Sequence, residues 1–285
     1  MIVTLENDLY TVTFETKGAE LISLINKKNN RNYIWEGDPA FWGKHSPILF
    51  PIVGTLKNDM YYHNDQTYVL PRHGFARDME FDIHSQNSNS ITFSLISNAE
   101  TISKYPFEFE LHLCYTLSEN ELSFQYNVFN KSATDMPFSI GAHPAFALRA
   151  SFSNYSLAFE HQETLECFVL ENDLISNTSY PIQLKDTLLP LDYATFEKDA
   201  LIFKKLKSKS IVLLENENPL IRIDYADFPN LGIWTKTNAP FICIEPWNGY
   251  ADVIDTQSKL SEKDGIQIAK PNSDHQFSFS IHILS

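Results

Sequence analysis

Hydrophobic and polar residues alternate with a period of two along much of this chain. In the segment 107–117, FEFELHLCYTL, apolar or aromatic residues occupy every second position from Phe107 to Leu117. Such alternation is typical of a strand with one buried face. The segment 121–129, ELSFQYNVF, alternates in the same way after the turn residues Ser118-Glu119-Asn120. The two segments therefore predict an antiparallel hairpin.

The same alternation recurs in the segments 91–97, 220–225 and 276–284, whereas sustained apolar stripes with a helical period are rare. Fourteen prolines and frequent Asn, Asp and Ser clusters divide the alternating runs at short intervals, as in many strands joined by turns. No fixed-period repeat, low-complexity linker or composition break divides the 285 residues. The pattern predicts an all-β, antiparallel fold with little helix, in a single domain over residues 1–285.

Charge and composition narrow the classes of partner. The chain has 22 Lys and Arg against 36 Asp and Glu, a formal net charge of -14, which disfavours nucleic acid and anionic membrane surfaces. The first residues, MIVTLENDLY, meet a charge at Glu6, and no run of about 18 apolar residues follows. We therefore expect a cytoplasmic protein with no nucleic acid and no membrane partner.

Three cysteines, Cys114, Cys167 and Cys243, lie far apart and form no C-x-x-C pair. This spacing favours neither a disulfide framework nor a thiolate zinc site. We expect reduced, mostly packed thiols.

The stretch SIGAHPAFAL (139–148) places one histidine between small and apolar residues. Pro144 offers no backbone N–H and pushes His143 towards extended backbone angles, so the imidazole is held, facing a cavity. A single histidine in such a place is also common as a satisfied core or turn residue. This segment alone leaves both interpretations open.

Two further segments contain side chains that are common in binding and catalytic sites. In LPRHGFARD (70–78), His73 lies between Arg72 and Arg77, whose planar guanidinium groups suit oxygen-rich ligands. In FICIEPWNGY (241–250), an apolar run delivers Glu245 at the end of a predicted strand, where partial burial raises the pKa of a carboxyl group towards that of a general base. Trp247 offers an apolar face that can stack on a sugar ring. An ordinary surface loop accounts for either segment about as well.

The motifs RHGFAR (72–77), GAHPAF (141–146) and EPWNG (245–249), in this order, resemble those of the aldose 1-epimerase (galactose mutarotase) family, and most closely its bacterial LacX-like branch. The segment WGKHSPILFPIVG (42–54) also resembles an early segment of that family and of hexose-6-phosphate mutarotases. The resemblance spans nearly the whole chain. It implies a galactose mutarotase-like β-supersandwich whose open cleft binds a monosaccharide and interconverts its α and β anomers without a cofactor or metal.

The resemblance also implies roles for three residues. Glu245 matches the base that takes the proton from the anomeric hydroxyl, and His143 matches the acid that protonates the ring oxygen. His73 matches a second histidine that binds the sugar near the ring oxygen. Acid and base act on two oxygens of one carbon, so His143 must be protonated when Glu245 is ionised, a pairing that mutual attraction favours.

The expected substrate contacts match the family pattern less closely than these three residues do. Related enzymes carry an arginine where this chain has Gly43-Lys44-His45, so either Lys44 or His45 replaces that contact or the contact is lost. Asp199 loosely matches an aspartate that binds sugar hydroxyls, and Trp234 and Trp247 are candidates for stacking on the sugar.

The form HGFAR resembles hexose-6-phosphate mutarotases, in which an arginine at the position of Arg77 helps to hold the phosphate. Lys44, Arg72 and Lys236 are candidates to complete such a pocket. The negative net charge argues mildly against it. We expect a free aldohexose first and its 6-phosphate second.

Two alternatives lie outside this chemistry. Two histidines and a carboxylate can form a facial triad for iron, but this chain has no His-x-His pair, and His73, His143 and Glu245 are far apart in sequence. A sugar-binding protein without catalysis would use tryptophans as platforms but has no need of both His143 and Glu245.

Overall fold

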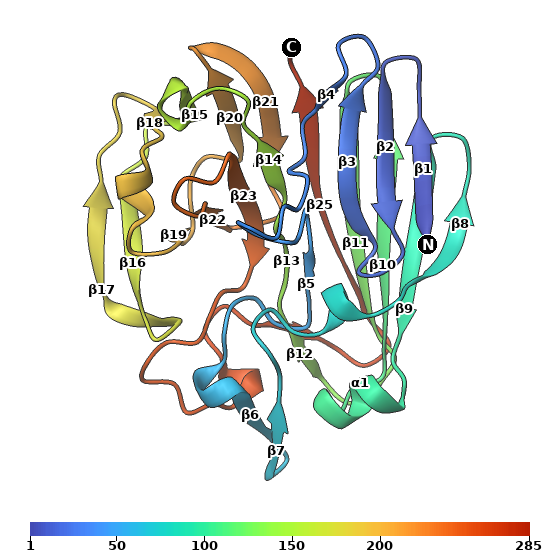
Figure 1. The fold of residues 1–285 in the computed structure, drawn as a ribbon. Helices are drawn as coiled ribbons and strands as arrows, with labels where there is room; N and C mark the ends of the chain where they lie inside the picture. The colour runs from blue at the N-terminus through green and yellow to red at the C-terminus, as the bar shows by residue number, and fades with distance from the viewer.

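The computed structural model describes all residues from 1 to 285 and consists mainly of antiparallel strands (Figure 1). Its one α-helix, α1 (Ala99–Lys104), has six residues. None of the helices has the length and apolar character needed to cross a membrane. The prediction of an all-β antiparallel fold with little helix is confirmed.

The strands form six sheets. The four-stranded sheet has the order β1 (Ile2–Glu6), β2 (Tyr10–Glu15), β3 (Glu20–Asn26), β4 (Arg31–Asn32). The nine-stranded sheet has the order β18 (Leu188–Pro190), β15 (Tyr155–Phe159), β20 (Ser210–Glu215), β21 (Asn218–Asp224), β25 (Asp274–Ile283), β11 (Glu121–Asn130), β10 (Phe109–Leu117), β9 (Ser90–Ile96), β8 (Asp82–Gln86).

The six-stranded sheet forms the floor of the site described below. Its order is β19 (Leu201–Phe203), β22 (Asn230–Trp234), β23 (Phe241–Asn248), β13 (Ile140–Ala142), β5 (Ile48–Leu49), and β14 (Ala145–Ala147) also pairs with β23. The two-stranded sheets are β6 (Met60–His63) with β7 (Gln66–Val69), β12 (Met136–Phe138) with β24 (Gln267–Ala269), and β16 (Leu165–Glu171) with β17 (Leu174–Ile182). Short 3₁₀ turns complete the chain: η1 (Lys57–Asp59), η2 (Ala76–Asp78), η3 (Phe152–Asn154), η4 (Tyr193–Phe196) and η5 (Leu260–Glu262).

The strands predicted from alternation are present with small shifts at their ends. Strands β10 and β11 form the predicted hairpin, closed by the pair Leu117 and Leu122. The segments 91–97, 220–225 and 276–284 correspond to β9, β21 and β25. Alternation succeeds here because one face of each strand packs on the core and the other faces solvent.

The prediction that Glu245 ends a strand is wrong, because β23 continues through Pro246 to Asn248. Pro246 pairs with Leu231 of β22, and the register places it opposite Ala142, the last residue of β13. Because Pro246 has no N–H, the ladder between β23 and β13 lacks one hydrogen bond. That position lies at the end of β13, so no bond inside the ladder is lost. Glu245 consequently lies inside a fully buried strand.

The four-stranded sheet packs against β9 and β10 of the nine-stranded sheet (Figure 1). The ring of Phe14 on β2 lies 4.5 Å from that of Tyr115 and 6.0 Å from that of Phe93, measured between centroids. These residues belong to a core of 68 buried hydrophobic residues that extends from Val3 to Ile283. Burial of each such side chain stabilises the fold by about 1.5–3 kcal/mol, so the inner faces hold the sheets together.

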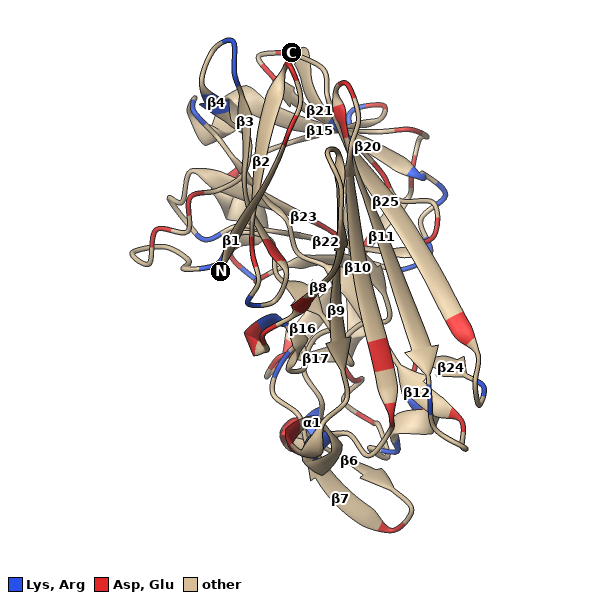
Figure 2. Cartoon of the chain, turned by 90° about the vertical axis from the view of Figure 1, so that its right-hand side faces the viewer, with Lys and Arg blue, Asp and Glu red and all other residues tan.

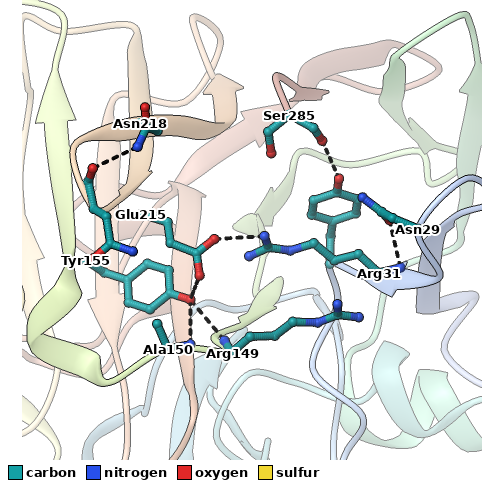
Figure 3. Close-up of polar contacts among 10 residues, drawn as sticks. Asn29, Arg31, Arg149, Ala150, Tyr155, Glu215, Asn218 and Ser285 are labelled. Carbon is teal, nitrogen blue, oxygen red and sulfur yellow. Dashed lines mark hydrogen bonds and ion pairs between the residues drawn. The ribbon is translucent and has the colours of Figure 1, made fainter.

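A polar network joins the first sheet to the nine-stranded sheet (Figure 3). The Glu215 carboxylate accepts hydrogen bonds from Arg31 at 2.8 Å and from the Tyr155 hydroxyl at 2.6 Å. That hydroxyl in turn accepts from the backbone N–H groups of Arg149 and Ala150. Since these two residues follow β14, the network fixes the chain where it leaves the six-stranded sheet.

A buried ion pair fixes the segment that follows β23. Nζ of Lys263 lies 3.2 Å from Oδ1 of Asp252, and the two side chains are 2% and 3% exposed. Oδ2 of Asp252 accepts from the backbone N–H of Lys57, and Lys263 donates to the carbonyl of Tyr250. Both charges are therefore compensated within the fold.

Replacing Lys263 with alanine leaves the Asp252 carboxylate buried without its counter-charge. We expect the free energy of unfolding to fall by about 3–5 kcal/mol, measured by urea denaturation. Lys259 is the matched control, because its ion pair with Glu262 is exposed and Lys259→Ala should cost under about 1 kcal/mol. Equal losses for the two variants would show that the buried pair has no special role.

Candidate active site

The register of the six-stranded sheet places His143 across from Glu245. Gly141 pairs with Trp247 and Ala145 pairs with Cys243, so two residues inward from each pair His143 stands opposite Glu245. Nε2 of His143 lies 3.3 Å from Oε2 of Glu245, close but not aligned for a hydrogen bond. Two groups that are about a hundred residues apart in sequence thus meet on one face of the sheet.

The same cross-strand row continues on the other side of β23. Gly232 of β22 pairs with Glu245, and Ile202 of β19 pairs with Gly232. Because side chains alternate between faces, residues two positions away point to the same side. Trp234 and Trp247 therefore share this face with the row.

His73 reaches the site from a tight turn. His73 and Gly74 both adopt left-handed backbone angles, with φ of 68° and 72°. A Cβ at residue 74 would collide with the carbonyl of Phe50, so glycine is required there. Nδ1 of His73 accepts from the backbone N–H of Gly54 at 3.1 Å. Nε of Arg72 approaches Nε2 of the same ring as a donor at 3.4 Å, so protein N–H groups face both ring nitrogens of His73.

These groups line a cavity of about 360 Å³, a size typical of small-molecule sites. Its wall is made by Trp42, Gly54, Thr55, Arg72, His73, Arg77, His143, Leu170, Asp173, Asp199, Ala200, Ile202, Trp234, Glu245, Trp247 and Ala251. The cavity thus gathers His73, His143, Glu245, Arg77, Asp199, Trp234 and Trp247 from the sequence prediction.

Lys44 is the predicted site residue that lies outside the cavity wall. Its ammonium group pairs with Asp78 at 3.0 Å. His45, the other candidate to replace an arginine, lies by the carbonyl of Glu36 and the carboxylate of Glu20. The cations that line the cavity are Arg72 and Arg77.

The structure adds residues that sequence reasoning missed or used only in passing. The indole of Trp42 stacks on His143, with centroids 4.8 Å apart and planes at 25°. Asp173, at the turn between β16 and β17, forms an ion pair with Arg72 at 3.1 Å. The dipeptide Asn172-Asp173 is a hairpin-turn signal, but nothing local indicates that this turn reaches the cavity.

Trp247 lies flat on backbone rather than standing open to a ligand. It is 5% exposed, and a Cβ at Gly232 would collide with its ring. A Cβ at Gly141 would lie 2.7 Å from its Cδ1 atom. The two glycines therefore make room for the indole, whose Nε1 has no hydrogen-bond partner in the protein. The more open aromatic surface comes from Trp42 and Trp234.

Burial dominates the electrostatics of the site. Loss of solvent lowers the pKa of His143 to about 3 and that of His73 well below its usual value. Loss of solvent also raises the pKa of Glu245 well above its usual value, opposed by the nearby charge of Arg72. Burial therefore favours a neutral pair that holds one proton on Glu245, rather than the ion pair expected from attraction alone.

Buried polar atoms without a protein partner concentrate at this cavity. Nine such side-chain atoms occur in the chain, and five belong to cavity residues: Thr55, Arg77, His143, Glu245 and Trp247. Each such atom costs about 1–3 kcal/mol if it stays unpaired. A ligand rich in hydroxyl groups can satisfy both the donors and the acceptors.

A family model for aldose 1-epimerase matches residues 1–263. The chain belongs to the aldose 1-epimerase family. Protein LacX (plasmid) of Lactococcus lactis subsp. lactis is 36% identical over the full length of both chains. A galactose mutarotase related enzyme from Lactobacillus acidophilus is 34% identical with a TM-score of 0.96, over 100% of this chain and 98% of that one. A galactose mutarotase-like protein from Lactobacillus casei ATCC 334 is 32% identical with a TM-score of 0.94, over the whole of both chains.

Membership of the aldose 1-epimerase family supports a mutarotase role and implies a sugar substrate. The resemblance inferred from the three motifs is thereby confirmed, together with the galactose mutarotase-like fold.

In this aldose 1-epimerase family member, Gly232→Ala should displace the Trp247 indole. We expect the free energy of unfolding to fall by about 1–3 kcal/mol through overpacking, with a change in tryptophan fluorescence. Gly43→Ala is the control, because its Cβ would have no neighbour nearer than 3.9 Å. A fully stable Gly232→Ala protein with an unchanged spectrum would contradict this account of Trp247.

Glu245→Gln should stabilise the protein increasingly as the pH rises. The folded state keeps a proton on Glu245 above pH 4.5, where the unfolded chain has lost it, so the wild type loses up to about 1.4 kcal/mol of stability per pH unit. Glutamine removes this loss. Melting temperatures at pH 5 and pH 8 test it, with the exposed Glu119→Gln as control. A constant difference between Glu245→Gln and wild type would show that Glu245 is ionised in the folded state.

Proposed function

We propose that this protein is a mutarotase for an unphosphorylated aldohexose, with Glu245 as base and His143 as acid. The observation that carries the proposal is the 3.3 Å approach of Nε2 of His143 and Oε2 of Glu245 in a cavity whose polar atoms lack protein partners. The two groups can contact two oxygens on a single carbon, which is what ring opening at an anomeric centre requires.

The reaction starts from the charged form of the pair, with Glu245 ionised and His143 protonated. Glu245 takes the proton from the O1 hydroxyl while His143 donates its proton to the ring oxygen, and the C1–O5 bond breaks. The products are the open-chain aldehyde and a neutral pair. Rotation about the C1–C2 bond presents the other face of the aldehyde, and closure returns both protons.

The pair therefore holds one proton while the sugar is cyclic and one while it is open. Only the position of that proton changes, from His143 to Glu245. Burial favours the neutral pair, and hence the state that accompanies the open-chain sugar. The charge of Arg72 lowers the pKa of Glu245 and so helps to keep the ionised base accessible.

The remaining cavity residues position the sugar. His73 lines the same cavity as His143, and their rings lie edge-on at 5.8 Å between centroids. Trp42 and Trp234 supply apolar surface for the sugar ring. Asp199, whose Oδ1 already accepts from the N–H of Ala200, offers its second oxygen to a sugar hydroxyl.

Charge pairing at the cavity favours a neutral sugar over its 6-phosphate. Arg72 forms an ion pair with Asp173. Asp78 forms ion pairs with Lys44, at 3.0 Å, and with Nε of Arg77, at 3.6 Å. Lys236 donates to the carbonyl of Phe41 instead of reaching the cavity wall. A phosphate would have to displace these carboxylates.

One observation keeps the 6-phosphate as the second candidate. Arg77 lines the cavity, and its buried Nε, although 3.6 Å from Asp78, is too far from that carboxylate for a hydrogen bond and has no other partner in the protein. The third candidate is a sugar-binding protein without catalysis, for which the tryptophans would suffice.

Saturation-transfer NMR of anomer exchange on galactose, glucose and their 6-phosphates separates these candidates. We expect the wild type to accelerate exchange of a free hexose, and Glu245→Gln and His143→Asn each to lose at least about a hundredfold in rate. The matched controls are Glu160→Gln and His161→Asn, an exposed Glu–His pair at 3.7 Å, which should retain full activity.

Faster anomer exchange of the 6-phosphates than of the free sugars would make the hexose-6-phosphate mutarotase the first candidate. Binding of a sugar with no acceleration of any of the four would establish the non-catalytic alternative and refute the roles of Glu245 and His143.

A further inference from the structure

A second cluster of polar side chains lies on the outer face of the nine-stranded sheet, away from the core and from the cavity. It consists of His84 on β8 and Glu110 and His112 on β10. Each offers one ligand atom, and the three atoms lie within 4.8 Å of one another. Strands β8, β9 and β10 lie side by side in Figure 2.

Strand alternation places two of these residues together. Glu110 and His112 are two positions apart on β10, whose other face is buried in the core. Oε1 of Glu110 lies 2.7 Å from Nε2 of His112. The ring of Phe129 packs edge-on against His112 at 5.1 Å and walls one side of the pair.

A β-bulge brings in the third residue from the edge of the sheet. The register of β8 against β9 shifts between Ile83 and Ser85, so His84 is the extra residue. Its ring reaches across β9 to lie 4.5 Å from that of His112, between centroids. Ser94, the β9 partner of His112, is only 7% exposed although it is on the outer face, because the two rings cover it. Bulges commonly redirect a side chain in this way.

We propose that His84, Glu110 and His112 bind a divalent transition metal ion such as Zn²⁺, with one coordination position left open to solvent. Two imidazoles and one carboxylate are a ligand set that suits Zn²⁺, whereas Mg²⁺ and Ca²⁺ prefer oxygen ligands. Ligand atoms around tetrahedral Zn²⁺ are separated by about 3.4 Å. Binding therefore needs a rotation of the exposed His84 and replacement of the 2.7 Å hydrogen bond between Glu110 and His112 by two bonds to the ion.

The surroundings of Glu110 fit this role. Nζ of Lys131 lies 3.3 Å from Oε2, the oxygen that does not face His112. Lys131 therefore orients the carboxylate while Oε1 remains directed at the cluster, as an outer partner of a metal ligand does. The bound ion would connect the edge strand β8 to β10 across β9 and stabilise the folded state by mass action.

The test is calorimetric titration of the full chain with ZnCl₂ after treatment with a chelator. We expect one site whose dissociation constant rises at least about tenfold in His84→Ala and in Glu110→Gln. His282→Ala is the matched control, because His282 is also half-buried on the outer face and pairs with a carboxylate, Asp224, at 2.8 Å. Mutarotation should be unchanged in all three variants.

A second group, His143, Cys243 and Glu245, also has metal-ligand chemistry, and two of its members, His143 and Glu245, line the cavity. His143→Asn separates the two locations, since Zn²⁺ binding at the outer cluster survives this change. The proposal is overturned if the wild type binds no Zn²⁺, if His84→Ala binds it as tightly as wild type, or if binding disappears in His143→Asn instead.

Discussion

The candidate site depends on the antiparallel register between β23 and the strands β13 and β14. This register sets His143 opposite Glu245, and the register of β23 with β22 sets Gly232 opposite Glu245 on the other side. A slip by one residue would turn every side chain of β23 to the other face, so the site and the core are specified together. The backbone ladder, rather than any contact between the two side chains, is what holds the pair in place.

That arrangement has an electrostatic cost that the rest of the fold avoids. The buried charges of Lys263 and Asp252 are matched by each other and by backbone groups, and Glu215 is matched by Arg31. The cavity instead collects buried polar atoms that no protein group satisfies. Such a concentration of unsatisfied groups costs stability and is typical of functional sites.

Sequence reasoning captured the strands and about half of the 16 cavity residues for different reasons. Alternation reports burial of one face directly, so β10 and β11 were predictable from local pattern alone. His73, His143 and Glu245 were found because they lie in motifs that the family shares. The continuation of β23 through Pro246 was missed, because a proline normally indicates the end of a paired strand. Here the hydrogen bond that proline cannot make lies where the neighbouring strand β13 ends, so pairing with β22 continues.

Residues whose role depends on distant packing gave no local signal. Lys44 looks like a free cation in the sequence, and only the fold brings Asp78 to it. Asp173 occupies an ordinary hairpin turn, and its place at the cavity follows from how β16 and β17 pack against the sheet. The apolar run before Glu245 did indicate that burial raises the pKa of its carboxyl group, whereas the lowered pKa of His143 comes from a burial that sequence reasoning did not weigh against attraction.

The hairpin of β16 and β17 reaches the cavity from outside the sheet that carries the His143–Glu245 pair. The His143–Glu245 pair is built into a sheet whose strands constrain one another, whereas Asp173 stands on a two-stranded appendage with its own local turn. Changes in the length or tip of that hairpin can alter what pairs with Arg72 at the rim without disturbing the register beneath. A loop tip of this kind tolerates insertions and substitutions that a strand inside the sheet does not.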